Sequence, residues 1–277
     1  MSRTDVLISA DELLNRLQSA PAPRLLDVRW TLPKPDGRDD FAAGHIPGAI
    51  YVDLDTELAS HDNTDPTAGR HPLPSPEAFQ ETVRSWGIDA DTEVVVYDDN
   101  ASLGAARAWW LLRWAGVSAR VLDGGLAAFR DAGGQLETGD SVPVEPSSMV
   151  ITPGQLPVID ADAAAGFDGV LLDARAGERF RGETEPLDPQ AGHIPGAKNA
   201  PATDNVPAGT FLPEADLRQR FEALGALDQS VGVYCGSGVT ACHNALALAT
   251  LGIEASLYPA SWSGWSSDPD RPVATGD

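Results

Sequence analysis

Cysteine is scarce in this sequence of 277 residues, which contains only Cys235 and Cys242. Two cysteines so close together in sequence cannot form a disulfide framework, and a low count is typical of proteins in a reducing cytoplasm. With His243 beside them they do not make a zinc site either, because a fourth ligand is missing. We therefore expect a cytoplasmic protein without a bound metal.

Positive charge is also scarce. The chain has 19 lysines and arginines against 41 aspartates and glutamates, which gives a formal net charge of −22. Such a chain repels the phosphate backbone of nucleic acids, so we expect no nucleic-acid partner, and its charge mainly favours solubility. If the substrate is an anion, a local group of positive side chains must overcome the field of the whole protein.

Long apolar stretches are absent from the sequence. No run approaches the roughly 20 apolar residues that a membrane-spanning helix needs, and Met1–Asp5 lacks the apolar segment of a signal peptide. We expect no membrane association. Hydrophobic residues still make up 42% of the chain, and 277 residues suit two domains better than one.

The sequence repeats itself once. Leu25–Arg29 reads LLDVR and Leu171–Arg175 reads LLDAR, while Gly44–Ala49 and Gly192–Ala197 both read GHIPGA. The separation between the copies is too long for a solenoid repeat. It suits a duplicated domain.

We predict an N-terminal domain over residues 1–137, a linker over 138–157 that is rich in Pro, Ser, Thr and Gly, and a C-terminal domain over 158–277. In both copies, short β-rich segments alternate with helical patterns. This alternation predicts an α/β fold in which each domain has a mostly parallel sheet with helices on both faces. Ligand sites in such sheets lie at the carboxyl ends of the strands.

Cys235 stands at such a strand end. The apolar run Val231–Tyr234 predicts a buried strand, and Cys235 follows it directly. Two glycines come next, Gly236 and Gly238, and a helical pattern begins at Val239. Backbone N–H groups can point inward in such a turn, and a helix N-terminus adds partial positive charge. The loop therefore indicates a nucleophilic thiolate that can hold an anion on its sulfur.

Three interpretations of this loop compete. A phosphatase would need an arginine to hold the phosphate oxygens, and its usual place is taken by Ala241, which argues against that chemistry. A buried, inert cysteine at the end of a core strand is the second interpretation. The third is sulfur transfer, in which Cys235 takes up a sulfur atom and carries it as a persulfide.

The loop Cys235–Thr240, with the sequence CGSGVT, resembles the active loop of the mercaptopyruvate sulfurtransferases of the rhodanese superfamily. Thiosulfate-specific rhodaneses usually carry Arg and Lys where this chain has Gly236 and Ser237. The resemblance covers nearly the whole chain, and it implies two similar α/β domains, here rhodanese-like, with one active site. It also implies substrate-binding loop residues, which are Gly236, Gly238, Val239 and Thr240.

The resemblance assigns roles outside the loop as well. Asp98 takes the place of Cys235 in the first copy, and because an aspartate cannot carry a persulfide, the N-terminal domain is expected to be catalytically silent. Arg179 matches a substrate-binding arginine of the family, although an arginine is as often plain surface. The family's second arginine, nine residues on, is missing from the segment Thr184–Asp188, and Arg181 is the candidate replacement.

Ser237 is the hydroxyl group of the loop. In the family, the matching serine is proposed to work with a histidine and an aspartate of the N-terminal domain, which correspond to His71 and Asp55 here. On the sequence alone, Ser237 could be an ordinary turn residue and His71 a surface residue. The resemblance predicts a catalytic set of Cys235, Ser237, His71 and Asp55.

We predict a sulfurtransferase that moves a sulfur atom from 3-mercaptopyruvate onto Cys235 and releases pyruvate. A thiol acceptor, such as thioredoxin or a low-molecular-weight thiol, or cyanide in an assay, then takes the sulfur. The resemblance implies no metal and no organic cofactor. Two alternatives stay open: a thiosulfate:cyanide sulfurtransferase, and a non-catalytic sulfur carrier or binding protein.

Overall fold

The computed structural model describes residues 1–60 and 64–277. The chain divides into two compact units. The Asp98 unit consists of Thr4–Ala59 and Pro74–Gln155. The Cys235 unit consists of Met1–Arg3, Ser60–Leu73 and Leu156–Asp277. A segment from the N-terminal half of the sequence is thus part of the unit that contains Cys235.

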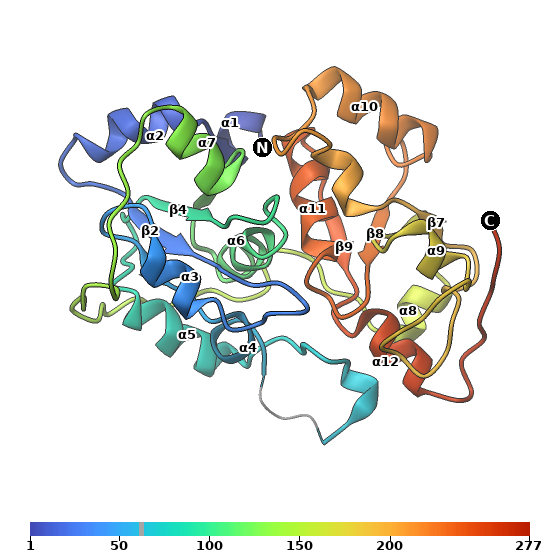
Figure 1. The fold of residues 1–277 in the computed structure, drawn as a ribbon. Coiled ribbons are helices and arrows are strands. Elements are labelled where there is room, and N and C mark those ends of the chain that lie inside the picture. The colour runs from blue at the N-terminus through green and yellow to red at the C-terminus, as the bar shows by residue number, and fades with distance from the viewer. Residues whose placement is uncertain (61–63) are drawn as a thin grey trace. The chain divides into compact units, whose positions relative to one another are not determined.

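The Asp98 unit is built on a parallel sheet of five strands in the order β1-β5-β4-β2-β3 (Figure 1). The strands are β1 (Leu7–Ile8), β2 (Arg24–Asp27), β3 (Ile50–Tyr51), β4 (Val94–Tyr97) and β5 (Ala119–Leu122). The helices are α1 (Arg3–Val6), α2 (Ala10–Leu17), α3 (Arg38–Ala43), α4 (Leu54–Glu57), α5 (Pro76–Ser85), α6 (Ala105–Trp114) and α7 (Gly125–Asp131).

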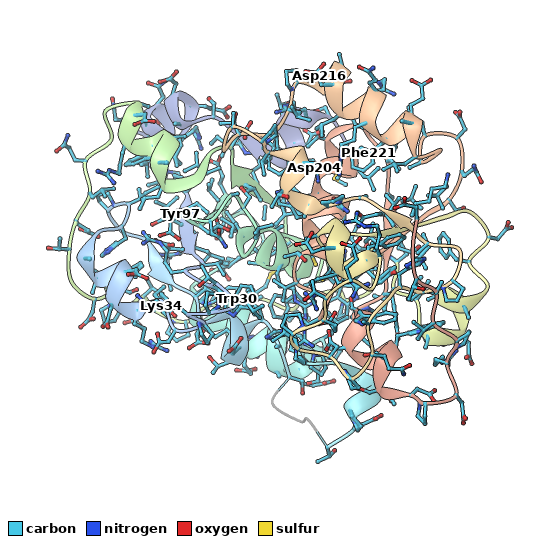
Figure 2. The ribbon with its side chains drawn as sticks, turned by 45° about the vertical axis from the view of Figure 1, so that its right-hand side comes forward. Trp30, Lys34, Tyr97, Asp204, Asp216 and Phe221 are labelled. Atoms are coloured by element: carbon cyan, nitrogen blue, oxygen red, sulfur yellow. The ribbon has the colours of Figure 1, made fainter. Side chains whose placement is uncertain are left out.

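Both faces of strand β4 are covered. The strand has the sequence VVVY and is buried at every position. Side chains alternate between the two faces along a strand. Tyr97, labelled in Figure 2, lies in a cluster with Leu13 of α2 and Phe129 of α7. Val96 points to the opposite face and is also fully buried. A strand buried on both faces reads as a continuous apolar run, as it does here.

The Cys235 unit is built on a parallel sheet of four strands in the order β7-β6-β8-β9 (Figure 1). The strands are β6 (Val170–Asp173), β7 (Lys198–Asn199), β8 (Val231–Tyr234) and β9 (Ala255–Leu257). The helices are α8 (Ala161–Ala165), α9 (Gly177–Phe180), α10 (Glu214–Ala223), α11 (Ala241–Thr250) and α12 (Ser261–Ser267), with the short 3₁₀ helices η1 (Pro66–Ala68) and η2 (Ala202–Asn205).

Helix α10 illustrates how the sequence pattern directs packing in this unit. Leu217 and Phe221 are both fully buried. Residues four apart lie on one face of a helix, so these two side chains form its apolar stripe. Asp216 is exposed, and Figure 2 shows it on the outer side of the helix.

Equivalent residues of the two repeats pair in the same way, each within its own sheet. Asp27 pairs with Tyr97 across β2 and β4, and Asp173 pairs with Tyr234 across β6 and β8. The predicted α/β fold, with a parallel sheet and helices in each half, is confirmed. Within residues 1–60 and 64–277, no helix combines the length and the apolar character that crossing a membrane requires.

Of the segment predicted as a linker, residues 138–157, the part up to residue 155 belongs to the Asp98 unit and makes hydrogen bonds within it. The N–H of Tyr51 donates to Ser141 Oγ at 2.8 Å, and Arg84 Nε donates to the carbonyl of Met149 at 2.8 Å. Such bonds hold the segment along the unit. The domain boundaries themselves stay a prediction.

Candidate functional site

The first turn of α12 holds the loop of Cys235. Cys235 directly follows β8, and it is 1% exposed. Its N–H donates to Ser261 Oγ at 3.1 Å, and its carbonyl accepts from the N–H of Trp262 at 2.9 Å. The carbonyl of Gly236 accepts from the N–H of Ser263 at 2.8 Å. These bonds fix the loop at the carboxyl end of the strand, where ligand sites of parallel sheets lie.

Gly238 turns the backbone toward the sulfur. Its N–H donates to Cys235 Sγ at 3.1 Å. Gly238 has φ +83°, and a Cβ at this position would lie 2.3 Å from the carbonyl oxygen of Pro259. A larger residue would therefore displace the loop. A backbone N–H directed at sulfur is the arrangement that stabilises a thiolate or a persulfide.

Val239 and Thr240 carry the loop into helix α11. The carbonyl of Val239 accepts from the N–H of Cys242, and the carbonyl of Thr240 accepts from the N–H of His243, both at 3.1 Å. These bonds span three residues, so the entry into the helix is tighter than an α-helical turn. For this reason α11 begins at Ala241, later than the helical pattern in the sequence indicates. Ligand binding by Val239 and Thr240 stays a prediction.

His71 and Ser237 lie against each other within the Cys235 unit. His71 Nδ1 and Ser237 Oγ are 2.8 Å apart and form a hydrogen bond. Ser237 is buried and His71 is half-buried. The structure thus brings together three residues of the predicted catalytic set, since Ser237 is also in the loop of Cys235. A histidine that is hydrogen-bonded to a hydroxyl group can take part in proton transfer near neutral pH.

Asp55, the fourth residue of that set, belongs to the Asp98 unit. It lies on α4, and its Oδ1 accepts from the indole N–H of Trp30 at 3.2 Å. Its action on His71 stays a prediction.

Two guanidinium groups lie against Gly236. A Cβ at this glycine would be 3.2 Å from Arg70 Nη2 and 3.4 Å from Arg179 Nη1. They are a local source of positive charge, although the carboxylates of Glu185 and Asp188 pair with them. Arg181 is occupied elsewhere: its Nε donates to Glu183 at 2.8 Å, and its side chain is 37% exposed.

Sequence reasoning did not identify Arg70 as a site residue. It directly precedes His71 in the sequence, and a basic residue beside a candidate catalytic histidine is a usable signal in a chain with so few basic residues. The contact with Gly236 is long-range, however, and no local pattern encodes it.

Cys242 has a different environment from Cys235. It is fully buried in α11, and its thiol donates to the carbonyl of Gly238 at 3.3 Å. The neighbouring His243 stacks on Phe211 with 4.9 Å between ring centroids. In the described ranges, 1–60 and 64–277, no group of three or more His, Cys, Asp or Glu side chains could hold a metal ion.

The Asp98 loop contains a negative group of its own. Asp98 directly follows β4, just as Cys235 follows β8, and it is 1% exposed. Its carboxylate accepts four backbone N–H groups at 2.9 Å, from Asn100, Ser102, Gly104 and Ala105. Burial raises the pKa of Asp98, and these donors, led by Ala105, oppose that shift. The loop of this repeat is therefore a cradle for an anion, filled by a side chain.

Asp98→Ala is expected to lower the free energy of unfolding by at least about 3 kcal/mol, because buried N–H groups that lose their partner cost about 1–3 kcal/mol each. Urea unfolding of the full chain measures this loss. The exposed Asp131, at the end of α7, is the matched control, and Asp131→Ala should change stability by less than about 0.5 kcal/mol. Equal losses in the two variants would show that the Asp98 carboxylate does not hold the loop together.

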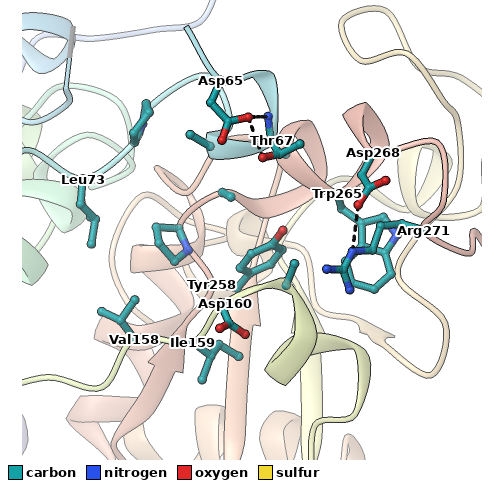
Figure 3. Close-up of a pocket in the computed structure, with 16 residues that line it drawn as sticks. Asp65, Thr67, Leu73, Val158, Ile159, Asp160, Tyr258, Trp265, Asp268 and Arg271 are labelled. Carbon is teal, nitrogen blue, oxygen red and sulfur yellow. Dashed lines mark hydrogen bonds and ion pairs between the residues drawn. The ribbon is translucent and has the colours of Figure 1, made fainter. Parts of the chain in front are cut away.

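A pocket of about 640 Å³ lies beside the loop in the Cys235 unit (Figure 3). Leu73 and Tyr258 supply apolar lining, and Arg271, paired with Asp268 at 3.4 Å, supplies charge. Its lining includes Pro72, which follows His71 in sequence, but none of the residues predicted for the site. The pocket is therefore a neighbour of the candidate site and not the site itself.

A family model and similar proteins of known sequence both place this chain among the rhodanese-like proteins. The profile of the rhodanese-like domain matches residues 9–132 and 159–268. The chain is 48% identical over 283 residues to the "Putative thiosulfate sulfurtransferase SseB" of Mycobacterium tuberculosis, with 99% of each chain covered. It is 48% identical over 282 residues to the "Probable 3-mercaptopyruvate sulfurtransferase" of Pseudomonas aeruginosa, with 98% of each chain covered.

Solved structures agree with these relatives. The 3-mercaptopyruvate sulfurtransferase from Leishmania major is similar with a TM-score of 0.84 at 31% identity, over 95% of this chain and 74% of that chain. SseA from Escherichia coli, a 3-mercaptopyruvate sulfotransferase, is similar with a TM-score of 0.80 at 33% identity, over 92% of this chain and 98% of that chain.

Proposed function

Because the chain belongs to the rhodanese-like family of sulfurtransferases, we propose that it takes a sulfur atom from 3-mercaptopyruvate through a persulfide on Cys235. The observation that carries this proposal is the arrangement at the loop. Cys235 Sγ accepts the N–H of Gly238, and the neighbouring Ser237 is hydrogen-bonded to His71. The sulfur nucleophile and Ser237 therefore share one loop, and His71 reaches that loop from the segment Ser60–Leu73.

In the first half-reaction, the Cys235 thiolate attacks the sulfur of 3-mercaptopyruvate. A sulfur–sulfur bond forms, the carbon–sulfur bond breaks, and its electron pair leaves with the carbon as the enolate of pyruvate. The N–H of Gly238 stabilises negative charge on the sulfur, much as an oxyanion hole does. Protonation of the enolate then completes pyruvate.

Ser237 and His71 are the groups we assign to that proton. Ser237 is two residues from Cys235 in the sequence. Its Oγ is 2.8 Å from His71 Nδ1. The hydroxyl can give its proton to the enolate while Nδ1–H of a protonated His71 ring replaces it, which leaves the ring neutral. We further propose that Asp55 supports His71, as the family resemblance predicts.

The second half-reaction returns the enzyme to its starting state. A sulfurtransferase of this family requires a sulfur donor and a thiol acceptor. We propose thioredoxin or a low-molecular-weight thiol, whose thiolate attacks the outer sulfur of the persulfide and releases the Cys235 thiolate. We also propose a cytoplasmic location, because a free, reactive cysteine suits a reducing compartment.

Thiosulfate is the second candidate donor. It carries two negative charges, and two guanidinium groups lie against Gly236. The Mycobacterium tuberculosis relative is also named for thiosulfate. Against this candidate, the Ser237–His71 pair offers little to a reaction whose leaving group, sulfite, needs no proton at carbon.

Side-by-side kinetics are expected to give a kcat/KM for 3-mercaptopyruvate at least about tenfold above that for thiosulfate, which corresponds to about 1.4 kcal/mol. The Ser237–His71 pair can assist only the donor that leaves as an enolate. The assay uses the same thiol acceptor for both donors. A preference for thiosulfate would refute the donor assignment.

The mass of the protein separates an enzyme from a sulfur carrier. A chain that gains the mass of one sulfur atom on Cys235 but does not turn over with excess acceptor would be a carrier, not an enzyme.

A further inference from the structure

The two guanidinium groups at Gly236 each present one terminal nitrogen to this residue, and within residues 1–60 and 64–277 no hydrogen bond of these two nitrogens is seen. Arg70 directs Nη2 toward Gly236, and Arg179 directs Nη1 there, at 3.2 and 3.4 Å from the position of a Cβ. The two nitrogens therefore lie against the residue that directly follows the nucleophile. Any side chain at Gly236 would occupy the space that they enclose.

Buried carboxylates hold the other side of each guanidinium. Asp188 Oδ1 accepts from Arg70 Nη1, and Asp188 Oδ2 accepts from Arg179 Nη2 at 3.2 Å. Glu185 accepts from Arg179 Nη2 at 2.6 Å and from Nε at 3.2 Å. The side chains of Asp188 and Glu185 are 2% and 3% exposed. The acids therefore lie beneath the arginines and fix their orientation.

Asp188 bridges two like charges that would otherwise repel each other. The pKa of Arg70 is lowered from its usual value, first by burial and then by the charge of Arg179, while the charges of Cys235 and Glu185 oppose the shift. The Arg70 side chain is 31% exposed, which leaves it accessible to a small anion.

We propose that Arg70 is a substrate-binding residue and that Arg70 and Arg179 together bind the carboxylate of the donor, with Asp188 as the residue that positions both. Two guanidinium groups on one carboxylate form charge-assisted hydrogen bonds, which are the strong kind. The segment Thr184–Asp188, which lacks the second arginine that the family resemblance implies, supplies instead the carboxylate that holds Arg70. This proposal rests on the proposed function, because the donor must carry a carboxylate.

The test is steady-state kinetics with 3-mercaptopyruvate. Arg70→Met should lower kcat/KM about 10- to 100-fold, chiefly through a higher KM, because a hydrogen bond to a charged group contributes about 1.5–3 kcal/mol. Arg70→Lys keeps the charge but not the planar group, so its KM should lie between the two. The exposed Arg181 is the matched control, and Arg181→Met should leave both constants within about twofold of wild type.

Asp188→Asn tests the positioning role. This change should raise KM in the wild-type background and have a smaller effect in Arg70→Met, because residues that act through one another are not additive. Full additivity would overturn the role of Asp188.

The proposed function and the role of Arg70 can be refuted separately. If the wild-type protein does not turn over 3-mercaptopyruvate, the proposed function fails and this assignment fails with it. If wild type turns it over and Arg70→Met has an unchanged KM, only the assignment of Arg70 fails. A raised KM in Arg181→Met, equal to that in Arg70→Met, would also overturn it.

Discussion

Cys235→Ser is expected to abolish sulfur transfer with every donor, whereas Cys242→Ser should keep most of the activity. Only Cys235 stands at the carboxyl end of β8 with a backbone N–H directed at its sulfur. A serine oxygen at this position can neither attack sulfur efficiently nor carry a persulfide. Cys242 is buried in α11 and donates to the carbonyl of Gly238, a bond that a serine hydroxyl can also make.

Two measurements check this expectation. Turnover is assayed with 3-mercaptopyruvate and with thiosulfate, and intact mass after exposure to each donor shows whether one sulfur atom has been added. Cys242→Ser should gain that mass and Cys235→Ser should not. Equal losses of turnover in the two variants would contradict a single nucleophile.

The loop around Cys235 could be predicted because its determinants are local. An apolar strand, a cysteine, two glycines and a helix follow one another within Val231–Thr250. The duplication strengthened the prediction, since Asp98 marks the same strand end in the other copy. The structure adds a physical reason for that likeness: in both repeats the turn directs backbone N–H groups at a buried anionic or nucleophilic atom.

The position of the segment Ser60–Leu73 could not be predicted in the same way. Its sequence lies in the first repeat, but its described residues belong to the Cys235 unit. Two glycines permit this packing: a Cβ at Gly69 would lie 2.5 Å from the carbonyl oxygen of Ala260, and one at Gly264 would lie 2.4 Å from that of Thr67. Close approach of two backbones is decided by tertiary structure, and the sequence shows it only as glycines with no local purpose.

The basic residues of the site show the same limit of prediction from sequence. The family resemblance predicts His71. It assigns no role to Arg70, the residue directly before it, so the sequence alone did not predict that residue. Arg181 was considered for the second cation because it is close to Arg179 in sequence. It pairs with Glu183 instead. Proximity along the chain was therefore a poor guide to the second cation.

His71→Ala is expected to lower kcat for 3-mercaptopyruvate by at least about tenfold, a threshold set below the roughly 10²–10⁴-fold that general acid–base groups typically contribute. His71 Nδ1 is 2.8 Å from Ser237 Oγ, so its loss leaves the hydroxyl without a group that restores its proton. Thiosulfate turnover should fall less, because sulfite leaves without protonation at carbon. Asp55→Ala should show the same bias between donors if Asp55 supports His71.

The donor ratio and the pH profile decide between chemistry and structure in the His71 variants. His71→Asn keeps a polar group near the position of Nδ1 but does not titrate near neutral pH, so it separates hydrogen bonding to Ser237 from proton transfer. In the proposed mechanism, His71→Asn loses about as much kcat as His71→Ala, and an ionisation seen in the wild-type profile of kcat disappears. If His71→Asn keeps wild-type kcat, the residue only positions Ser237. Equal losses with both donors would mean that His71 supports the loop and not the proton transfer, and full activity in His71→Ala would remove it from the site.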